Sequence, residues 1–349
     1  MSLEFLIAGA MIVALVFYAL LGGADYGGGV WNLFARGARA KAQRELISEA
    51  IGPVWEANHV WLILVIVILF TAFPPAFAAI STALHIPLTL MLIGIVLRGA
   101  AFTFRAYDSE RDQVQRRWSR IFSMASILTP VLLGLTLGAI ASGSVRLVNG
   151  VPVNGFFNSW LALFPFAVGF FALALFAFLA AVYLTLETND RALQDDFRLR
   201  ALLSGVTVGA LALVVFLLSG SGAPKIRAGI SASGWALPLH ISTAVCATAA
   251  FYALWKRMYR LARMCAVGQV TLILLGWASA QYPYIVEPDI TITSAAAPRA
   301  TLRLLLMALI AGAILLFPSF YYLFRVFKGQ TAFASLGGKA GAQSFKKLR

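Results

Sequence analysis

The chain has 349 residues, of which 60% are hydrophobic and only 12% are charged, and its mean hydropathy is +0.84. A soluble domain carries about 25% charged residues, so this composition excludes an ordinary soluble protein and predicts a polytopic membrane protein. The net charge of +14 would suggest a nucleic-acid partner for a soluble chain, but basic loops account for it in a membrane protein. We therefore expect no nucleic-acid partner.

Nine apolar runs are long enough to cross a bilayer, which takes about 20 residues of helix. The first has no positive n-region and is longer than a signal-peptide core, so we interpret it as a retained span. The second and third are nearly continuous, and we expect Pro74-Pro75 to divide them into two helices joined by a very tight turn. The predicted spans are residues 3–24, 54–73, 76–100, 121–143, 159–186, 201–222, 234–255, 264–283 and 301–324.

The basic residues orient these spans. Of the 28 Lys and Arg residues, 22 lie in the connections after the odd-numbered spans and in the C-terminal tail, and five lie on the other side. Because cytoplasmic loops carry the excess of Lys and Arg, the N-terminus is predicted to be outside and the C-terminus inside. The predicted fold is all-α, with one nine-helix transmembrane domain over residues 1–328 and a flexible basic cytoplasmic tail over residues 329–349.

Ionisable residues of the first three spans are predicted to gather near the cytoplasmic surface. Asp25 follows the first span, Glu56 and His59 lie in the first turns of the second, and Arg98 lies near the end of the third. Short connections make consecutive helices neighbours, so we expect these four side chains to lie close together. Ionisable residues within a membrane are costly and usually functional.

The segment IGPVWEANHVW, residues 51–61, has the pattern of a proton path. Glu56 and His59 are three residues apart, as are Trp55 and Asn58, so each pair is predicted to share a helix face. A carboxylate beside a histidine can hold and pass a proton. We predict a proton path formed by Glu56, Asp25, His59, Arg98, Trp55 and Asn58. In the alternative, the two acids only pair with Arg98 or cap helices.

Gly23 and Gly27 have the GxxxG spacing that lets helices approach closely, and we interpret them as packing residues. His85, near the middle of the third span, and His240, early in the seventh, are each alone and are interpreted as hydrogen-bonded core residues. Two bis-histidine haems would need four histidines and the chain has three, so we expect no haem and no metal in it.

A second polar group lies near the outer end of the eighth span. Glu287 and Asp289 are interpreted as a solvated loop pair; the alternative is a surface that meets a partner.

Several segments resemble subunit II of the cytochrome bd-type quinol oxidases in order and spacing, over most of the chain. They are GADYGGG at 23–29, IGPVWEANHVWL at 51–62, FTAFP at 70–74, LRG at 97–99, FTFR at 102–105 and the Tyr-Pro segment near 282. GPVW followed by an acid, Asn and VWL is the specific signal.

The resemblance implies a heterodimer in the bacterial cytoplasmic membrane. The haem-bearing subunit I would hold haem b and haem d, or b-type haems only, oxidise quinol and reduce dioxygen to water. This chain would stabilise subunit I and carry protons from the cytoplasm, with two four-helix bundles and one peripheral helix. The resemblance also allows a structural quinone in this chain, bound lipids, and a small single-span accessory subunit as a further partner.

In the resemblance, Glu56 matches the family's acid after GPVW, Asp25 its acid in the glycine motif, and Arg98 its arginine after the third span. Glu56 is one methylene longer than the usual aspartate, and His59 stands where many members have a carboxylate or amide, which indicates a divergent branch such as the cyanide-insensitive kind. Two other classes stay open, namely a proton-coupled secondary transporter and a purely structural assembly subunit.

Overall fold

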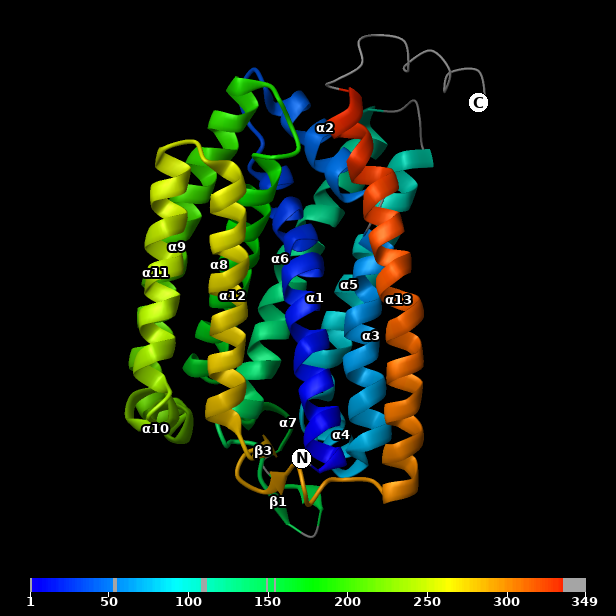
Figure 1. Cartoon of the computed structure of the whole chain (residues 1–349), viewed down its shortest axis with the longest axis vertical. Helices are drawn as coiled ribbons and strands as arrows, with labels where there is room; N and C mark the ends of the chain where they lie inside the picture. The colour runs from blue at the N-terminus through cyan, green and yellow to red at the C-terminus, as the bar shows by residue number, and fades with distance from the viewer. Residues whose placement is uncertain (1, 53–54, 108–111, 149, 154, 335–349) are drawn as a thin grey trace.

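The computed structural model describes residues 2–52, 55–107, 112–148, 150–153 and 155–334. Within these residues, nine helices are long and apolar enough to cross a membrane, as predicted, and they run side by side along the long axis of the molecule (Figure 1). They are α1 (Leu3–Leu33), α3 (Trp55–Ala72), α5 (His85–Tyr107), α6 (Asp112–Ala141), α8 (Leu163–Leu184), α9 (Arg191–Gly222), α11 (Ala236–Trp255), α12 (Tyr259–Gln281) and α13 (Arg299–Ala334).

Short elements occupy the two ends of the helix bundle. At one end lies the short helix α2 (Ala40–Ile51), and we call this the α2 end (Figure 1). The opposite end carries the N-terminus and two antiparallel two-stranded sheets, and we call it the hairpin end. Its elements are α4 (Pro74–Ala83), α7 (Gly155–Asn158), α10 (Pro224–Ala232), β1 (Leu147–Val148) paired with β2 (Val151–Pro152), and β3 (Tyr284–Val286) paired with β4 (Ile290–Thr291).

The core lies around α1, α6 and α8. In the most apolar segments of α6 and α8, 78% and 61% of the residues are buried. In the corresponding segment of α13, only 6% are buried. Helix α1 packs on α3, α6 and α8, while α13 packs mainly on α1 and α3. The exposed residues of α9, α11 and α13 are mostly apolar, which suits a surface covered by lipid tails.

Helix α1 is longer than predicted. We expected the first span to end at residue 24, but the helix continues to Leu33. The glycines allow close packing: a Cβ at Gly23 or Gly27 would overlap atoms of Phe176 on α8, and one at Gly28 would contact Ile51 of α2. The packing role of the GxxxG pair is confirmed. Asp25 therefore lies two turns inside the helix and not at its end.

The third predicted span, 76–100, is wrong at its start. Helix α3 ends at Ala72 and α4 begins at Pro74, as the proline pair predicts, but α4 is a separate short helix that stops at Ala83. Leu84 (φ −115°, ψ 21°) breaks the helix before α5 begins. The spanning segment is residues 85–104.

Proline explains this second break. Pro87 lacks a backbone N–H and disfavours helix in the residue before it, but it is tolerated in the first turn of a helix. His85 is consequently the first residue of α5 and does not lie in mid-span as predicted. Its Nδ1 atom lies 2.9 Å from the carbonyl oxygen of Thr82.

Glu287 at the hairpin end is not the solvated residue that we expected. It is only 5% exposed, and its Oε1 atom lies 3.8 Å from Nζ of Lys225 on α10. Asp289 accepts hydrogen bonds from Nε of Arg146 (3.1 Å) and from the backbone N–H of Leu147 (2.8 Å). The two acids therefore connect the β3–β4 hairpin to α10 and β1.

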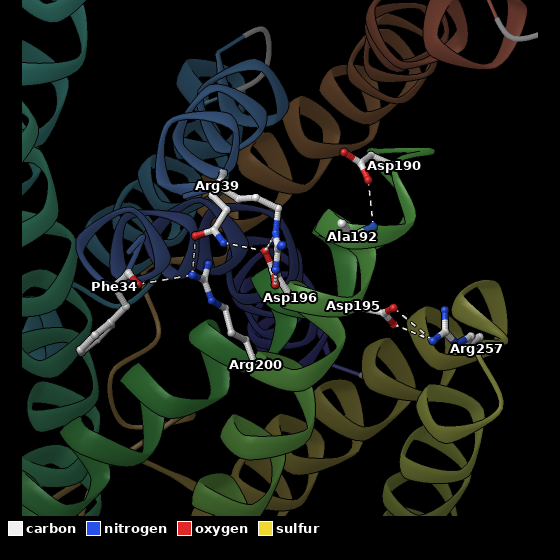
Figure 2. Close-up of polar contacts among 9 residues, drawn as sticks. Phe34, Arg39, Asp190, Ala192, Asp195, Asp196, Arg200 and Arg257 are labelled. Atoms are coloured by element: carbon white, nitrogen blue, oxygen red, sulfur yellow. Dashed lines mark hydrogen bonds and ion pairs between the residues drawn. The ribbon is translucent and has the colours of Figure 1, made fainter. Parts of the chain in front are cut away.

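A group of polar contacts joins α2 to α9 at the α2 end (Figure 2). Arg39 donates two hydrogen bonds to the carboxylate of Asp196, at 2.6 and 2.8 Å, and Gln43 donates a third at 2.7 Å. Arg200 donates to Oε1 of Gln43 at 2.6 Å. Asp190 accepts from the backbone N–H of Ala192 and so caps α9, which begins ten residues before the predicted span at 201.

The C-terminal helix also extends past its prediction. Helix α13 continues to Ala334, into the segment expected to be a flexible tail. The rest of that predicted tail, residues 335–349, lies outside the described residues, as do Pro53 and Val54 of the GPVW motif.

Candidate functional site

A buried polar cluster lies toward the α2 end, where α1, α3, α5 and α6 meet. Nδ2 of Asn58 donates a 2.7 Å hydrogen bond to Oδ2 of Asp25. Nε of Arg98 donates to Oγ of Ser126 at 3.2 Å, and Nη1 of Arg98 lies 3.5 Å from Nε2 of His59. Asp25, Asn58 and Arg98 are 5%, 2% and 1% exposed. Of the predicted site residues, the structure thus brings Asp25, Asn58, His59 and Arg98 together.

Aromatic rings enclose this cluster. The hydroxyl of Tyr18 donates to that of Tyr26 at 3.2 Å, and both rings lie about 6 Å from the ring of His59. The guanidinium of Arg98 lies 4.6 Å from the ring centre of Tyr26 and 5.2 Å from that of Phe122. The π faces favour the charge of Arg98, which has been removed from water.

Three members of the cluster are absent from the residues predicted from the sequence: Tyr18, Tyr26 and Ser126. Helical spacing could have found the first, because Tyr18 lies seven residues before Asp25 and so shares its side of α1. No local signal identifies Ser126, since its place beside Arg98 depends on how α6 packs against α5.

Glu56 lies apart from this cluster. Its side chain is exposed, whereas Asn58, two residues later and about 200° further around the helix, is buried. The structure therefore does not place Glu56 with Asp25 and Arg98 as we expected. Trp55 lies between these extremes: it is half-buried, and its ring centre is 6.3 Å from that of His59 and 5.7 Å from that of Phe102.

Several buried polar atoms in and beside the cluster have no hydrogen-bond partner in the described part of the chain. They are Nη2 of Arg98, Nδ1 of His59, Oδ1 of Asn58 and Nε1 of the neighbouring Trp61. Buried polar groups are almost always satisfied, and ordered water is the usual partner where protein groups are lacking.

His85 and His240 are not the core residues that we expected, because both are exposed. His85 and His240 each lie within hydrogen-bond distance of a backbone carbonyl oxygen, that of Thr82 and that of Ile230. His59 is enclosed by the rings of Tyr18 and Tyr26. Among the residues that the structure describes, no three His, Cys, Asp or Glu side chains group as metal ligands.

Comparison with known proteins gives one consistent result. The sequence matches the family model described as cytochrome bd terminal oxidase subunit II over residues 3–327. A putative cytochrome bd menaquinol oxidase subunit II from Bacillus subtilis (strain 168) is 25% identical over 343 residues, which cover 93% of this chain and 96% of that protein. Subunit 2 of the cytochrome bd-I ubiquinol oxidase of Escherichia coli (strain K12) is 26% identical over 218 residues, 60% of this chain and 54% of that protein.

A solved structure has the same fold. A chain of the bd oxidase from Geobacillus thermodenitrificans superimposes with a TM-score of 0.74, covering 94% of this chain and 99% of that one at 20% identity. At this identity the match supports the fold alone. The family model, by contrast, covers nearly the whole sequence, including the motifs that build the buried cluster. The chain belongs to the cytochrome bd terminal oxidase subunit II family.

Proposed function

We propose that this chain takes up protons from the cytoplasm for dioxygen reduction in subunit I, and that it stabilises that subunit. As subunit II, it is a multi-pass membrane component of a quinol oxidase, an oxidoreductase complex, and it partners subunit I. The observation that carries the proposal is the buried contact between Asp25 and Asn58 beside His59 and Arg98. Reduction of dioxygen to water consumes protons, which must reach a dry protein interior.

The orientation follows from the basic residues. The α2 end faces the cytoplasm in our proposal, because the basic connections between spans lie there, and this places the buried cluster near the cytoplasmic surface. In the arrangement that we propose, α1, α3, α5 and α6 form one four-helix bundle, and α8, α9, α11 and α12 form the other. Helix α13 is peripheral, because it packs mainly on α1 and α3. The complex would lie in the bacterial cytoplasmic membrane, as the bacterial relatives suggest.

The side chains of the cluster have different chemical tasks. A carboxylate and an imidazole accept and release protons, so Asp25 and His59 are the groups that would carry them. Asn58 fixes the orientation of the Asp25 carboxylate through its hydrogen bond. Arg98 stays charged and compensates the negative charge that remains when a proton leaves. The haems would reside in subunit I, where electrons and protons meet.

The exposed face of α3 is the surface that we assign to subunit I. Ile63 and Phe70 on this face are 58% and 60% exposed, and Glu56 lies on the same face seven residues before Ile63. A carboxylate facing lipid would be costly, although the cost falls toward the membrane surface. Protein contact would remove that cost. In this arrangement Glu56 is the residue that passes protons across the subunit boundary.

The test is to purify the two-subunit oxidase with Asp25→Asn or Glu56→Gln and measure oxygen consumption and haem content. We expect turnover to fall about tenfold or more with haem content unchanged, because each change removes a proton carrier but keeps its size. Glu49→Gln is the matched control: it makes the same chemical change at an exposed acid on α2, and turnover should be unaffected. Unchanged turnover in both assembled variants would refute the proposal.

The exposure of Glu56 also favours a second candidate, in which the chain acts only in assembly and Glu56 pairs with a group of subunit I. The same measurement separates the two. In the assembly role, Glu56→Gln lowers the amount of haem-bearing complex recovered, and the complex that does form turns over at the normal rate.

A further inference from the structure

A cavity at the α2 end leads from the protein surface to the buried cluster. Five helices contribute to its walls: α1, α2, α3, α8 and α12. About 50 Å³ is available to the centres of water molecules. Roughly 10 to 15 Å³ is needed for one water, so the cavity can hold a short chain of them. Its lining residues are Leu21, Ala24, Asp25, Gly28, Ala50, Ile51, Asn58, Ala180, Tyr183, Leu184, Glu187 and Arg263.

The polar groups of this cavity are arranged along its depth. Glu187, just after α8, and Arg263, on the first turns of α12, are half-buried. The guanidinium of Arg263 lies 4.9 Å from the ring centre of Tyr183. Asp25 and Asn58 lie at the buried end, joined by their 2.7 Å hydrogen bond. Water that entered beside Glu187 would therefore reach the Asp25 carboxylate.

The walls between these polar groups are made of small and apolar residues. A Cβ on Gly28 would come within 2.5 Å of Cδ1 of Ile51, so α1 and α2 leave little room for side chains there. Such walls confine water to a narrow column, which suits proton transfer between water molecules.

We propose that this cavity is a proton entrance within subunit II, with Glu187 as the acid at its mouth and Asp25 as the acceptor at its end. The proposal rests on the proposed function, in which Asp25 carries protons. Bulk water gives a proton to the Glu187 carboxylate, which passes it along the water column to Asp25 and is left ionised for the next one. Glu56 does not line the cavity, so this entrance is separate from the face assigned to subunit I.

The first test removes the acid or fills the column in the purified two-subunit oxidase. Glu187→Gln and Ala50→Leu should each slow oxygen consumption several-fold, up to roughly tenfold, with haem content unchanged. Glu49→Gln and Ala42→Leu are the matched controls. Both residues are on α2 and neither lines the cavity, so their variants should keep the normal rate.

The second test asks whether water reaches the cavity. With Cys246 and Cys265 replaced by alanine, Ala50→Cys should react with a membrane-impermeant thiol reagent, and the reaction should slow turnover. Ala42→Cys, treated in the same way, should show no loss of turnover.

The outcomes separate this inference from the proposed function. If Asp25→Asn slows turnover but Glu187→Gln, Ala50→Leu and the modified Ala50→Cys do not, the entrance is wrong and the proton role of Asp25 stands. If neither Asp25→Asn nor Glu56→Gln slows turnover, the proposed function itself fails. Normal turnover in Glu187→Gln together with slow turnover in Ala50→Leu would keep the cavity as the route but remove Glu187 from it.

Discussion

Glu287 illustrates how one residue's environment changes its chemistry. Burial at the hairpin end raises the pKa of its carboxyl group, and the nearby Lys225 ammonium opposes this only in part. The folded state therefore binds the proton of Glu287 more tightly than the unfolded chain does. The stability that this provides is present at low pH and is lost as pH rises through the raised pKa.

We predict that Glu287→Gln reduces this pH dependence, because glutamine stays neutral. Relative to the wild type, the variant should gain stability as pH rises above the ordinary pKa of glutamate, about 4.5. Thermal unfolding of the purified complex across this pH range measures the difference. Glu49→Gln, at an exposed acid on the opposite end, should follow the wild-type curve. A Glu287→Gln variant with a parallel curve would contradict the assignment.

At the scale of elements, the contact between α1 and α8 positions the candidate site. Gly27 of α1 lies directly against the backbone of Phe176 and the side chain of Ala180 on α8. This close approach keeps the C-terminal part of α1 in the core, where Asp25 and Tyr26 face α3 and α5. A wider spacing would pull both cluster residues away from Asn58 and Arg98.

We predict that Gly27→Ala destabilises the subunit by about 1 to 3 kcal/mol, because the added Cβ overlaps atoms that cannot easily move. Gly9→Ala is the control on the same helix, since no atom lies within 4 Å of a Cβ added there. The control should be neutral or slightly stabilising. The midpoint of thermal unfolding and the yield of haem-containing complex provide the readout; equal midpoints for the two variants would show that the contact is not tight.

At the scale of the whole molecule, two outer surfaces are similarly apolar, but they differ in the charged residues that they carry. The outward face of α3 carries Glu56 in line with Ile63 and Phe70. The outward face of α9 exposes Leu213 and Leu217, and residues 197–222 of this helix include no Asp or Glu. Lipid tails suit the second surface. The first is the better candidate for contact with subunit I.

A photo-crosslinking residue placed at Ile63 should therefore form a covalent adduct with subunit I in membranes, while the same residue at Leu213 should not. The two positions are equally exposed in this subunit, at 58% each. A difference in crosslinking would therefore report whether subunit I or lipid contacts each position. Denaturing gels and mass spectrometry of the adduct identify the crosslinked chain. Crosslinking from Leu213 alone would reverse the assignment of the two faces.

Spans could be predicted from the sequence because hydrocarbon imposes a simple requirement, about 20 apolar residues for each helix. The proline pair at 74 and 75 predicted the end of α3 for a similarly local reason. Proline has no backbone N–H and cannot donate the hydrogen bond that would continue the helix. Predictions from local sequence failed where tertiary packing determines the structure. Helix α1 continues past its predicted end at residue 24, and α8 and α2 pack against its glycines where larger residues would not fit.

The sequence by itself determined the class of protein, the number of spans and the polar residues that make up most of the candidate site. Only the tertiary structure decided which of those residues meet. Asp25, Asn58 and Arg98 come from three helices and converge because α1, α3, α5 and α6 pack at one place. Glu56 faces outward although it is two residues from Asn58, since a helix turns about 100° per residue and only its neighbours decide which side is buried.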